Sequence, residues 1–134
     1  FRALIYKNVI DGTEHIALVK GKVLKNKNIL VRMHSLNIYS DLLDPENKTL
    51  SNSIKKISKL ENGIIVLIRN PKKELLGIDK RKETSRRNTL KEYGIGAQIL
   101  LDLGAKKITL LTSTTKNIIG VDGFGLEING TKKL

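Results

Sequence analysis

Short apolar runs separated by polar turns organise the first half of the chain. Residues 1–6 and 15–24 are two such runs on either side of a Gly-containing turn, which predicts a pair of strands. Residues 25–34 predict a third strand, and the continuous apolar run 63–69 predicts a buried central strand. Residues 41–50 contain a proline and several turn-forming side chains, so we expect a loop there.

Helical spacing of apolar side chains occurs on both sides of a long charged stretch. Residues 49–63 repeat apolar side chains three positions apart, and Gly63 can end this helix. Residues 94–105 predict a second helix, closed by Gly104. Its inward side chains are expected to be Ile99, Leu100 and Leu103. The charged stretch between the two, residues 70–92, is weakly periodic and predicts no element.

Two further strands are predicted near the end of the chain, at residues 106–112 and 126–129. Strands therefore come first and helix–strand alternation follows. This order is typical of a single α/β or α+β domain, which we expect to cover residues 1–134.

The composition narrows the class of protein further. The 134 residues suit one domain, and 40% of them are hydrophobic, as in ordinary soluble proteins. The chain has no Cys, which excludes disulfides and thiolate metal sites and fits a reducing compartment. No apolar run approaches the roughly 20 residues of a membrane span. Because the chain begins at Phe1 on a strand-like run, we expect it to be a fragment of a longer protein.

The net charge of +12 favours anionic partners. Much of it lies between Lys55 and Lys91, where twelve Lys or Arg stand against four Asp or Glu. Such a run is more often a solvated face than an anion site, and we favour the solvated face. Aromatic residues make up 4% of the chain and include no Trp, so we expect no stacking platform for single-stranded nucleic acid.

Arg32, His34 and Ser35 close the third predicted strand. Arg32 and His34 share one face of a strand, and if Met33 packs in the core, both face outward. They could then line a pocket for an anion, whereas the plain alternative is a surface Arg with an incidental His. A metal site built from His15, His34 and nearby carboxylates has no ligand spacing to support it.

A polar loop follows the strand predicted at residues 106–112. Thr112 to Lys116 offers hydroxyls, main-chain N–H groups and one Lys, which together can hold phosphate. An ordinary loop after a strand has the same composition, and residue types alone favour it. They also give no Ser-His-Asp arrangement and no prominent carboxylate pair, so by themselves they indicate only a basic α/β domain.

Four segments together resemble the GTP cyclohydrolase II family: residues 11–21, 29–35, 93–112 and 120–128. The resemblance covers nearly the whole chain and is closest to the cyclohydrolase half of bifunctional riboflavin proteins. In those proteins this half follows a 3,4-dihydroxy-2-butanone 4-phosphate synthase domain. The resemblance implies the family's α/β fold, a mixed sheet with flanking helices, shortened around the active site. It also implies that the chain is the C-terminal domain of such a fusion.

The resemblance implies chemistry on GTP, whose imidazole ring the family opens with a zinc ion held by three Cys and with magnesium at the phosphates. On this sequence Asp41 falls on a family Asp, and the three Cys positions fall on Asn37, Lys48 and Leu50. Leu50 has no donor atom, and Lys48 brings a positive charge to the place of a cation. We therefore expect no metal ligands and no cofactor.

Further family positions differ in this chain. The family's proposed catalytic Asp and Arg fall on Thr89 and Lys91, and the segment between Arg69 and Tyr93 is shorter than in the family. No catalytic residue is therefore expected. What the resemblance leaves is a set of substrate-positioning groups: Arg32, His34, Ser35, Arg69, Lys73, Thr112 and Lys116.

These implications give one expected function. We expect a cytoplasmic, catalytically degenerate domain of riboflavin biosynthesis, which serves as a structural, dimerising or regulatory appendage of the synthase. The family implies a homodimer, and we expect neither a membrane nor nucleic acid as a partner.

Two main alternatives stay open at this point, beside nucleic-acid binding, a weaker option that rests on the charge alone. The first is cyclohydrolase activity through a new metal shell drawn from His34, Asp41, Asp44 or Glu46. The second is nucleotide or flavin binding without chemistry.

Overall fold

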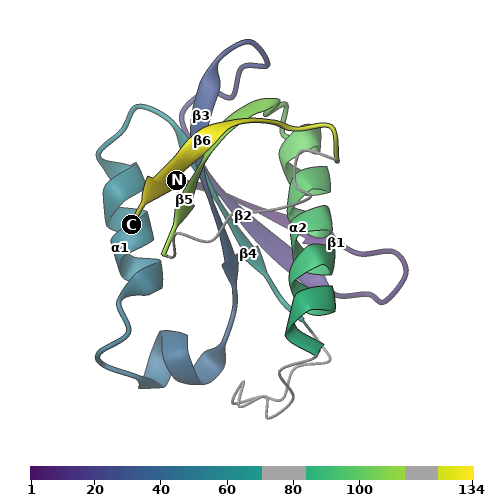
Figure 1. Ribbon diagram of the computed structural model, residues 1–134, viewed down its shortest axis with the longest axis vertical. Helices are drawn as coiled ribbons and strands as arrows, with labels where there is room; N and C mark the ends of the chain where they lie inside the picture. Colours follow the sequence, from purple (N-terminus) through teal and green to yellow (C-terminus); the bar gives the residue numbers. More distant parts are fainter. Residues whose placement is uncertain (71–83, 114–123) are drawn as a thin grey trace.

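A six-stranded mixed sheet forms the centre of the computed structural model, which describes residues 1–70, 84–113 and 124–134 (Figure 1). The strand order is β1-β2-β4-β3-β5-β6. The strands are β1 (Arg2–Lys7), β2 (Glu14–Lys20), β3 (Asn28–Ser35), β4 (Gly63–Ile68), β5 (Lys107–Thr112) and β6 (Glu127–Lys133). β1 and β2 form an antiparallel hairpin that joins β4 through an antiparallel pairing, while β4, β3, β5 and β6 run parallel.

Two helices flank the sheet on opposite sides, as Figure 1 shows. Helix α1 (Thr49–Ser58) packs on β3 and β4 from one side. Helix α2 (Thr84–Asp102) packs on the same two strands from the other side. A short π-helical turn, η1 (Tyr39–Leu43), lies between β3 and α1. Neither described helix has the length and apolar character of a membrane span.

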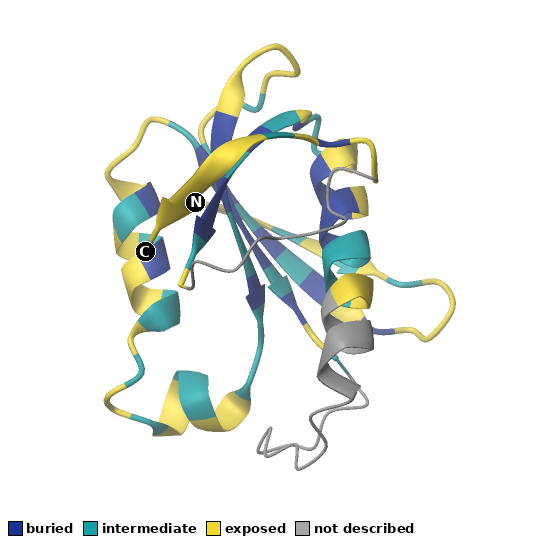
Figure 2. Cartoon of the chain, in the orientation of Figure 1, coloured by how far each residue is buried: buried dark blue, intermediate teal, exposed yellow. Residues whose placement is uncertain are grey.

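The sheet has a separate apolar core on each face, as the burial colouring of Figure 2 indicates. On the α2 face, Ala97, Ile99 and Leu100 of the helix pack on a large buried cluster from four strands, β2 to β5, and the turns beside them. On the α1 face, Ile57 packs with Leu30, Ile65 and Leu111 in a smaller cluster. Burial of these side chains provides the main stabilising force. The predicted inward positions of the second helix and the α/β mixed sheet are thus confirmed.

The loop expected at residues 41–50 is only partly present. η1 occupies its first residues, up to Leu43, which was not predicted. Helix α1 begins at Thr49, where the predicted helix also began. Asp and Asn side chains accept main-chain N–H groups here, including Asn47 Oδ1 from the Thr49 amide at 3.0 Å. Such local bonds hold turns that apolar spacing does not reveal.

The sequence pattern predicted that Gly63 ends the first helix, but the structure differs. α1 ends at Ser58, and Gly63 is the first residue of β4. It is buried, and a Cβ built on it would collide with Cγ2 of Ile57. Gly63 therefore lets the strand pass close beneath the end of α1, a packing requirement that a sequence pattern cannot distinguish from a helix stop.

Helix α2 begins ten residues earlier than predicted, at Thr84 instead of residue 94. Lys, Arg, Glu and Leu are good helix formers even without an apolar period, so the charged stretch can extend a helix whose C-terminal half is anchored in the core. The side chains of residues 84–89 and all of residues 71–83 lie outside the described part of the chain.

Candidate functional site

Parallel strands bring five of the predicted residues to one edge of the sheet. Ser35 of β3 is level with Ile68 of β4, so Arg69 follows at the same edge. Thr112 ends β5, which runs parallel to β3. Arg32 and His34 lie on β3 just before Ser35. The carboxyl ends of parallel strands are where α/β folds commonly bind ligands.

Two predicted residues cannot be placed at this edge. Lys73 and Lys116 both lie outside the described residues. Of the two positions that replace the family's catalytic residues, Lys91 lies on α2 with its side chain exposed. Thr89 also lies on α2, but its side chain is outside the described part.

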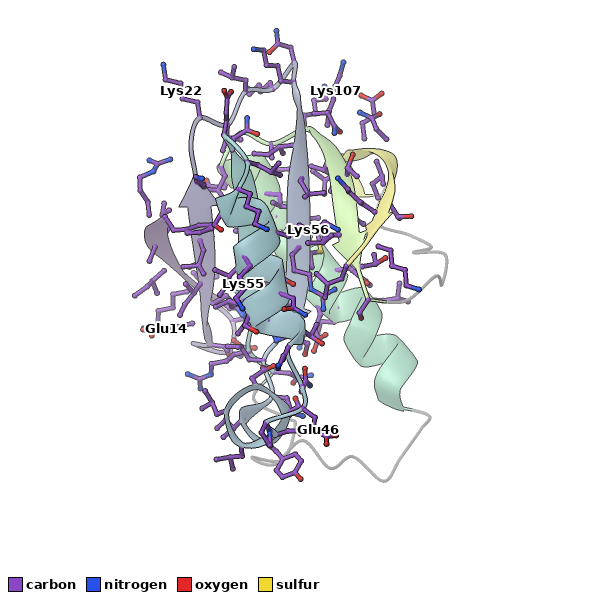
Figure 3. The ribbon with its side chains drawn as sticks, turned by 90° about the vertical axis from the view of Figure 1, so that its left-hand side faces the viewer. Glu14, Lys22, Glu46, Lys55, Lys56 and Lys107 are labelled. Atoms are coloured by element: carbon purple, nitrogen blue, oxygen red, sulfur yellow. The ribbon has the colours of Figure 1, made fainter. Side chains whose placement is uncertain are left out.

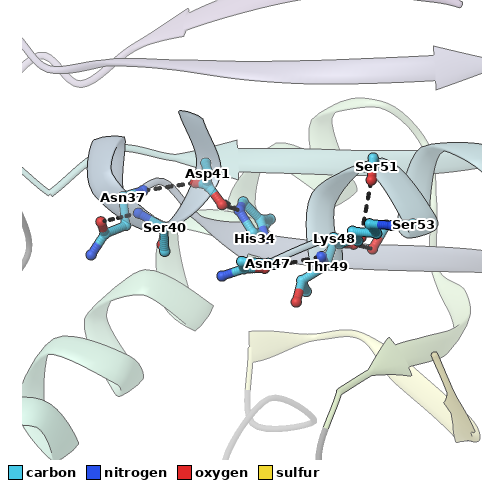
Figure 4. Close-up of polar contacts among 9 residues, drawn as sticks. All are labelled: His34, Asn37, Ser40, Asp41, Asn47, Lys48, Thr49, Ser51 and Ser53. Atoms are coloured by element: carbon cyan, nitrogen blue, oxygen red, sulfur yellow. Dashed lines mark hydrogen bonds and ion pairs between the residues drawn. The ribbon is translucent and has the colours of Figure 1, made fainter. Parts of the chain in front are cut away.

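His34 and Asp41 form the most buried polar pair of the site. His34 Nε2 lies 2.9 and 3.0 Å from the two carboxylate oxygens of Asp41, and the two side chains are only 7% and 5% exposed. An ionised carboxylate only accepts hydrogen bonds, so His34 Nε2–H is the donor. The same carboxylate accepts the main-chain N–H of Asn37 at 2.9 Å, and Asn37 Oδ1 accepts that of Ser40 at 3.0 Å (Figure 4). The network therefore fixes η1 against the end of β3.

Arg32 and His34 do not face outward, contrary to the sequence-based expectation. Met33 does pack against the core under α2, as supposed. The opposite face of β3 is not solvent, however, because η1 and α1 lie over it (Figure 4). His34 is 6% exposed, and Arg32 is half-buried and donates from Nη1 to the Leu111 carbonyl at 3.2 Å. Burial lowers the pKa of Arg32 from its ordinary value.

Arg32 and His34 each have one buried side-chain nitrogen without a hydrogen-bond partner among the described residues. They are Arg32 Nε and His34 Nδ1, neither of which has a hydrogen-bond partner within the described part of the chain. Buried polar atoms are nearly always paired. Both nitrogens lie on the α1 face of β3, where a buried water or another small polar group would be needed to satisfy them.

A second polar group lies on the α2 face of the same edge. Ser35 Oγ donates to Glu92 of α2 at 2.9 Å, and His15 Nδ1 accepts the main-chain N–H of Arg69 at 3.1 Å. Burial lowers the pKa of His15 from its ordinary value, so the ring is neutral near pH 7. The side chain of Arg69 itself is exposed.

Glu92 and the role of His15 were not found from the sequence. Glu92 stands in a charged stretch with no periodic signal, and His15 stands in a turn-like context. Only the docking of α2 on the sheet places Glu92 beside Ser35, 57 positions away in the chain. Tyr93 next to it is half-buried against the core, and burial raises its pKa.

The positions that the resemblance assigns to zinc ligands do not fit that metal. The side-chain oxygen of Asn37 accepts the main-chain N–H of Ser40. Lys48 precedes α1 with an exposed side chain, and its carbonyl accepts the main-chain N–H of Asn52 at 2.8 Å. The same carbonyl accepts the Ser51 hydroxyl at 3.1 Å (Figure 4). Leu50 packs against the apolar cluster under α1. A lysine ammonium and a leucine offer zinc no ligand, and these positions supply none of the Cys or His ligands that structural zinc sites use.

A rearranged metal shell is not formed either. Among the described residues, no group of three or more His, Cys, Asp or Glu is close enough to hold a metal ion. Of the four residues expected as possible ligands of a new metal shell, His34 and Asp41 contact each other. Asp44 instead accepts the main-chain N–H of Glu46 at the surface.

Comparisons with known proteins agree on one family. The model of the family described as GTP cyclohydrolase II matches residues 1–133. Monofunctional riboflavin biosynthesis protein RIBA 2, chloroplastic, from Arabidopsis thaliana is 34% identical over 97% of this chain and 30% of its own length. Bifunctional riboflavin biosynthesis protein RIBA 1, chloroplastic, from the same plant is 32% identical over 97% of this chain and 28% of its own length.

A bacterial relative gives the same result. Riboflavin biosynthesis protein RibBA from Chlorobium phaeovibrioides is 32% identical over 96% of this chain and 36% of its own length. The chain therefore spans about a third of the length of each of these curated relatives.

Proposed function

This chain belongs to the GTP cyclohydrolase II family, and from that premise we propose that it is a catalytically degenerate domain of riboflavin biosynthesis. In this proposal it serves a longer protein as a structural, dimerising or regulatory appendage of a 3,4-dihydroxy-2-butanone 4-phosphate synthase. Support for the pathway comes from relatives whose names state riboflavin biosynthesis. A cytoplasmic location remains a prediction.

One observation supports the proposed absence of GTP ring-opening activity. The three positions at which the resemblance places zinc ligands hold Asn37, Lys48 and Leu50, and each is engaged in holding the local fold. Zinc can generate a nucleophile near neutral pH by lowering the pKa of its bound water to about 7. No set of described residues offers a substitute metal shell. Ring opening would then lack its nucleophile.

The test is GTP turnover by the purified chain with zinc and magnesium supplied, beside an active family enzyme. We expect no ring-opened product by absorbance while the reference enzyme turns over. Turnover that a chelator abolishes would overturn the proposal. Turnover that survives the chelator would also overturn it, and would show a metal-independent route.

The appendage role needs a separate test in the longer protein. Synthase activity, thermal stability and association state would be measured with this domain present and with it deleted. We expect at least one of the three to fall on deletion. If all three are unchanged, the domain is no appendage of the synthase, whatever its activity toward GTP.

A second candidate function rests on the orphaned nitrogens of Arg32 and His34. A ligand with an acceptor for Arg32 Nε and a polar atom for His34 Nδ1 would satisfy both, and the net charge of +12 favours an anion. Nucleotide or flavin binding without chemistry therefore has a physical basis in this site.

Thermal shift with GTP and with flavin mononucleotide distinguishes this candidate. A ligand at 100 times its Kd adds about 2.7 kcal/mol of stability, which Arg32→Gln should reduce if the guanidinium makes the contact. Lys25→Glu, an exposed loop change, is the control for a general charge effect. A flat response to both ligands favours the bare scaffold.

A further inference from the structure

Two asparagines of this chain are followed directly by a glycine: Asn62 precedes Gly63, and Asn129 precedes Gly130. The main-chain nitrogen of a residue can attack the side-chain amide carbon of an asparagine before it. A glycine hinders this attack least, because it has no Cβ. In a folded protein the attack also requires that the two groups can move toward each other, and the structure gives the two pairs very different surroundings.

Asn62 and Gly63 are held by packing and by strand pairing. Gly63 is buried and pairs with Lys20 of β2 at the start of β4. A Cβ built on Gly21 would lie 3.0 Å from Cβ of Asn62, so the two segments of chain are in close contact. Asn62 Nδ2 also donates to the Lys22 carbonyl at 3.3 Å. Ring closure at this pair therefore requires the sheet to open locally.

Asn129 and Gly130 lie at an irregularity of the edge strand β6. Ile108 of β5 pairs with Ile128, and the next residue of β5, Thr109, pairs with Gly130. Asn129 is therefore the extra residue of a β-bulge and stands outside the ladder of pairs. Figure 3 shows β6 at the outer margin of the sheet, beyond β5. Both residues of this second pair are exposed.

The backbone of the bulge explains why a glycine follows Asn129. Gly130 has a φ of +153°, in a region that residues with a Cβ rarely adopt. Apart from its own chain neighbours, no atom lies within 4 Å of a Cβ built on Gly130. The bulge thus places a main-chain nitrogen with no side chain beside it, and with open space around it, next to the Asn129 amide.

A hydrogen bond to Asn28 holds the Asn129 side chain. Asn129 Nδ2 donates to Oδ1 of Asn28 at 3.0 Å, and Asn28 Nδ2 in turn donates to Thr109 Oγ1 at 2.8 Å. Both bonds are exposed, so water competes with them. This short chain of bonds slows ring closure at Asn129 but does not prevent it.

We propose that Asn129 is a site of spontaneous deamidation in the folded protein. The Gly130 nitrogen attacks Cγ of Asn129, loses its proton and expels the side-chain amide as ammonia, which leaves a succinimide ring. Water then opens the ring at either carbonyl and gives aspartate or isoaspartate. One water enters and one ammonia leaves, so no oxidant and no enzyme is needed. The net charge of +12 falls by one, and the modification is independent of the proposed function.

The aspartate product leaves the surroundings of the bulge intact. A carboxylate at position 129 can only accept hydrogen bonds. Asn28 can turn its amide, donate to this carboxylate and accept from the Thr109 hydroxyl, which is both a donor and an acceptor. The chain of bonds then persists with its direction reversed.

The isoaspartate product changes the strand itself, because its main chain runs through the former side-chain carbons and gains one atom. The end of β6 is displaced as a result. Lys56 Nζ of α1 donates to the Lys133 carbonyl there, and the Leu134 amide donates to the Thr112 carbonyl, both at 2.8 Å. Isoaspartate at position 129 therefore loosens contacts that reach the candidate site at Thr112.

The first experiment follows both asparagines by peptide mass spectrometry while the purified chain ages at mildly alkaline pH, folded or in urea. In the folded chain Asn129 should convert at least about tenfold faster than Asn62, since the latter must await local opening. In urea the two rates should be similar. Asn129→Gln is the control and should show no conversion, because its longer side chain closes the ring far less readily. Equal rates in the folded chain, or conversion of Asn129 only in urea, would overturn the proposal.

The second experiment tests the hydrogen bond that restrains the amide. Asn28→Ala removes the acceptor of Asn129 Nδ2 and should speed conversion about two- to tenfold. Asn26→Ala, an exposed change in the loop before β3, is the matched control and should leave the rate unchanged. A rate that Asn28→Ala does not raise would contradict the geometry proposed here.

The third experiment separates the two products. Ion exchange isolates the modified chain by its lost positive charge, and Asn129→Asp supplies the aspartate form alone. We expect Asn129→Asp to unfold at the temperature of the parent chain and the isoaspartate form to unfold at a lower one. Equal midpoints for these two forms would contradict the proposed effect on β6.

Discussion

The carboxylate of Asp41 lies 2.9 Å from Nε2 of His34, and together these two side chains close the end of β3 with almost no exposure to solvent. Seven positions separate them in the chain. The contact ties η1 to the sheet in the segment where the resemblance places a metal. A hydrogen-bonded pair of side chains thus fixes this turn against the sheet.

Removing the Asp41 carboxylate should destabilise the fold. Asp41→Ala takes the acceptor away from His34 Nε2–H and from the Asn37 amide, and unsatisfied buried donors cost about 1–3 kcal/mol. Urea unfolding measures the change. Asp44→Ala is the matched control, because the Asp44 carboxylate accepts only the exposed Glu46 amide among its described bonds, and about 0.5 kcal/mol is expected. Equal losses in the two variants would contradict a special role for Asp41.

Metal removal should leave the fold unchanged. Asn37, Lys48 and Leu50 offer zinc no suitable ligand set, and the described residues hold no other metal cluster. We expect chain expressed with added zinc to carry less than stoichiometric metal by elemental analysis, and its unfolding midpoint to be the same with and without chelator. A stoichiometric metal, or a midpoint that falls with chelator, would mean that ligands lie elsewhere in the chain.

Gly63→Ala should be destabilising through its contact with α1. The added Cβ would collide with Cγ2 of Ile57, and overpacking a close contact costs about 1–3 kcal/mol. A double-mutant cycle with Ile57→Ala measures the coupling. Because Ile57→Ala removes the colliding methyl group, Gly63→Ala should cost less in that background. Additive losses would mean that the cost arises in the backbone of β4 instead.

His15 should make stability fall in mild acid. Burial lowers its folded-state pKa, while the unfolded chain has the ordinary value of about 6.5. The folded state therefore binds fewer protons. Its contribution to stability is present above about pH 6.5 and is lost as the pH falls through the lowered folded-state pKa. Unfolding free energies measured between about pH 8 and pH 5 test this pH dependence.

A variant isolates the contribution of His15 from that of other groups. His15→Asn keeps a side-chain acceptor for the Arg69 amide but removes the titrating ring. The difference in unfolding free energy between parent and variant should shrink as the pH falls. A difference that is constant across the range would assign the acid sensitivity to another group.

The sequence alone determined much of the architecture. Gly63 to Ile68 read as a buried central strand because a strand covered on both faces is apolar at every position. Ile99 and Leu100 read as the inward face of a helix because helical spacing survives without knowledge of the partner. Both signals are local and periodic. The family also followed from the sequence, since its motifs lie in segments of continuous chain.

Tertiary structure decided which faces are covered. Alternation put Arg32 and His34 on one side of β3, but only the placement of η1 and α1 made that side an interior with orphaned nitrogens. Helix α1 does not extend over Ile5 of the neighbouring β1–β2 hairpin, and Ile5 is exposed. Alternation is a property of one strand, whereas coverage depends on where a helix far away in the chain docks, and that is set by packing across the whole sheet.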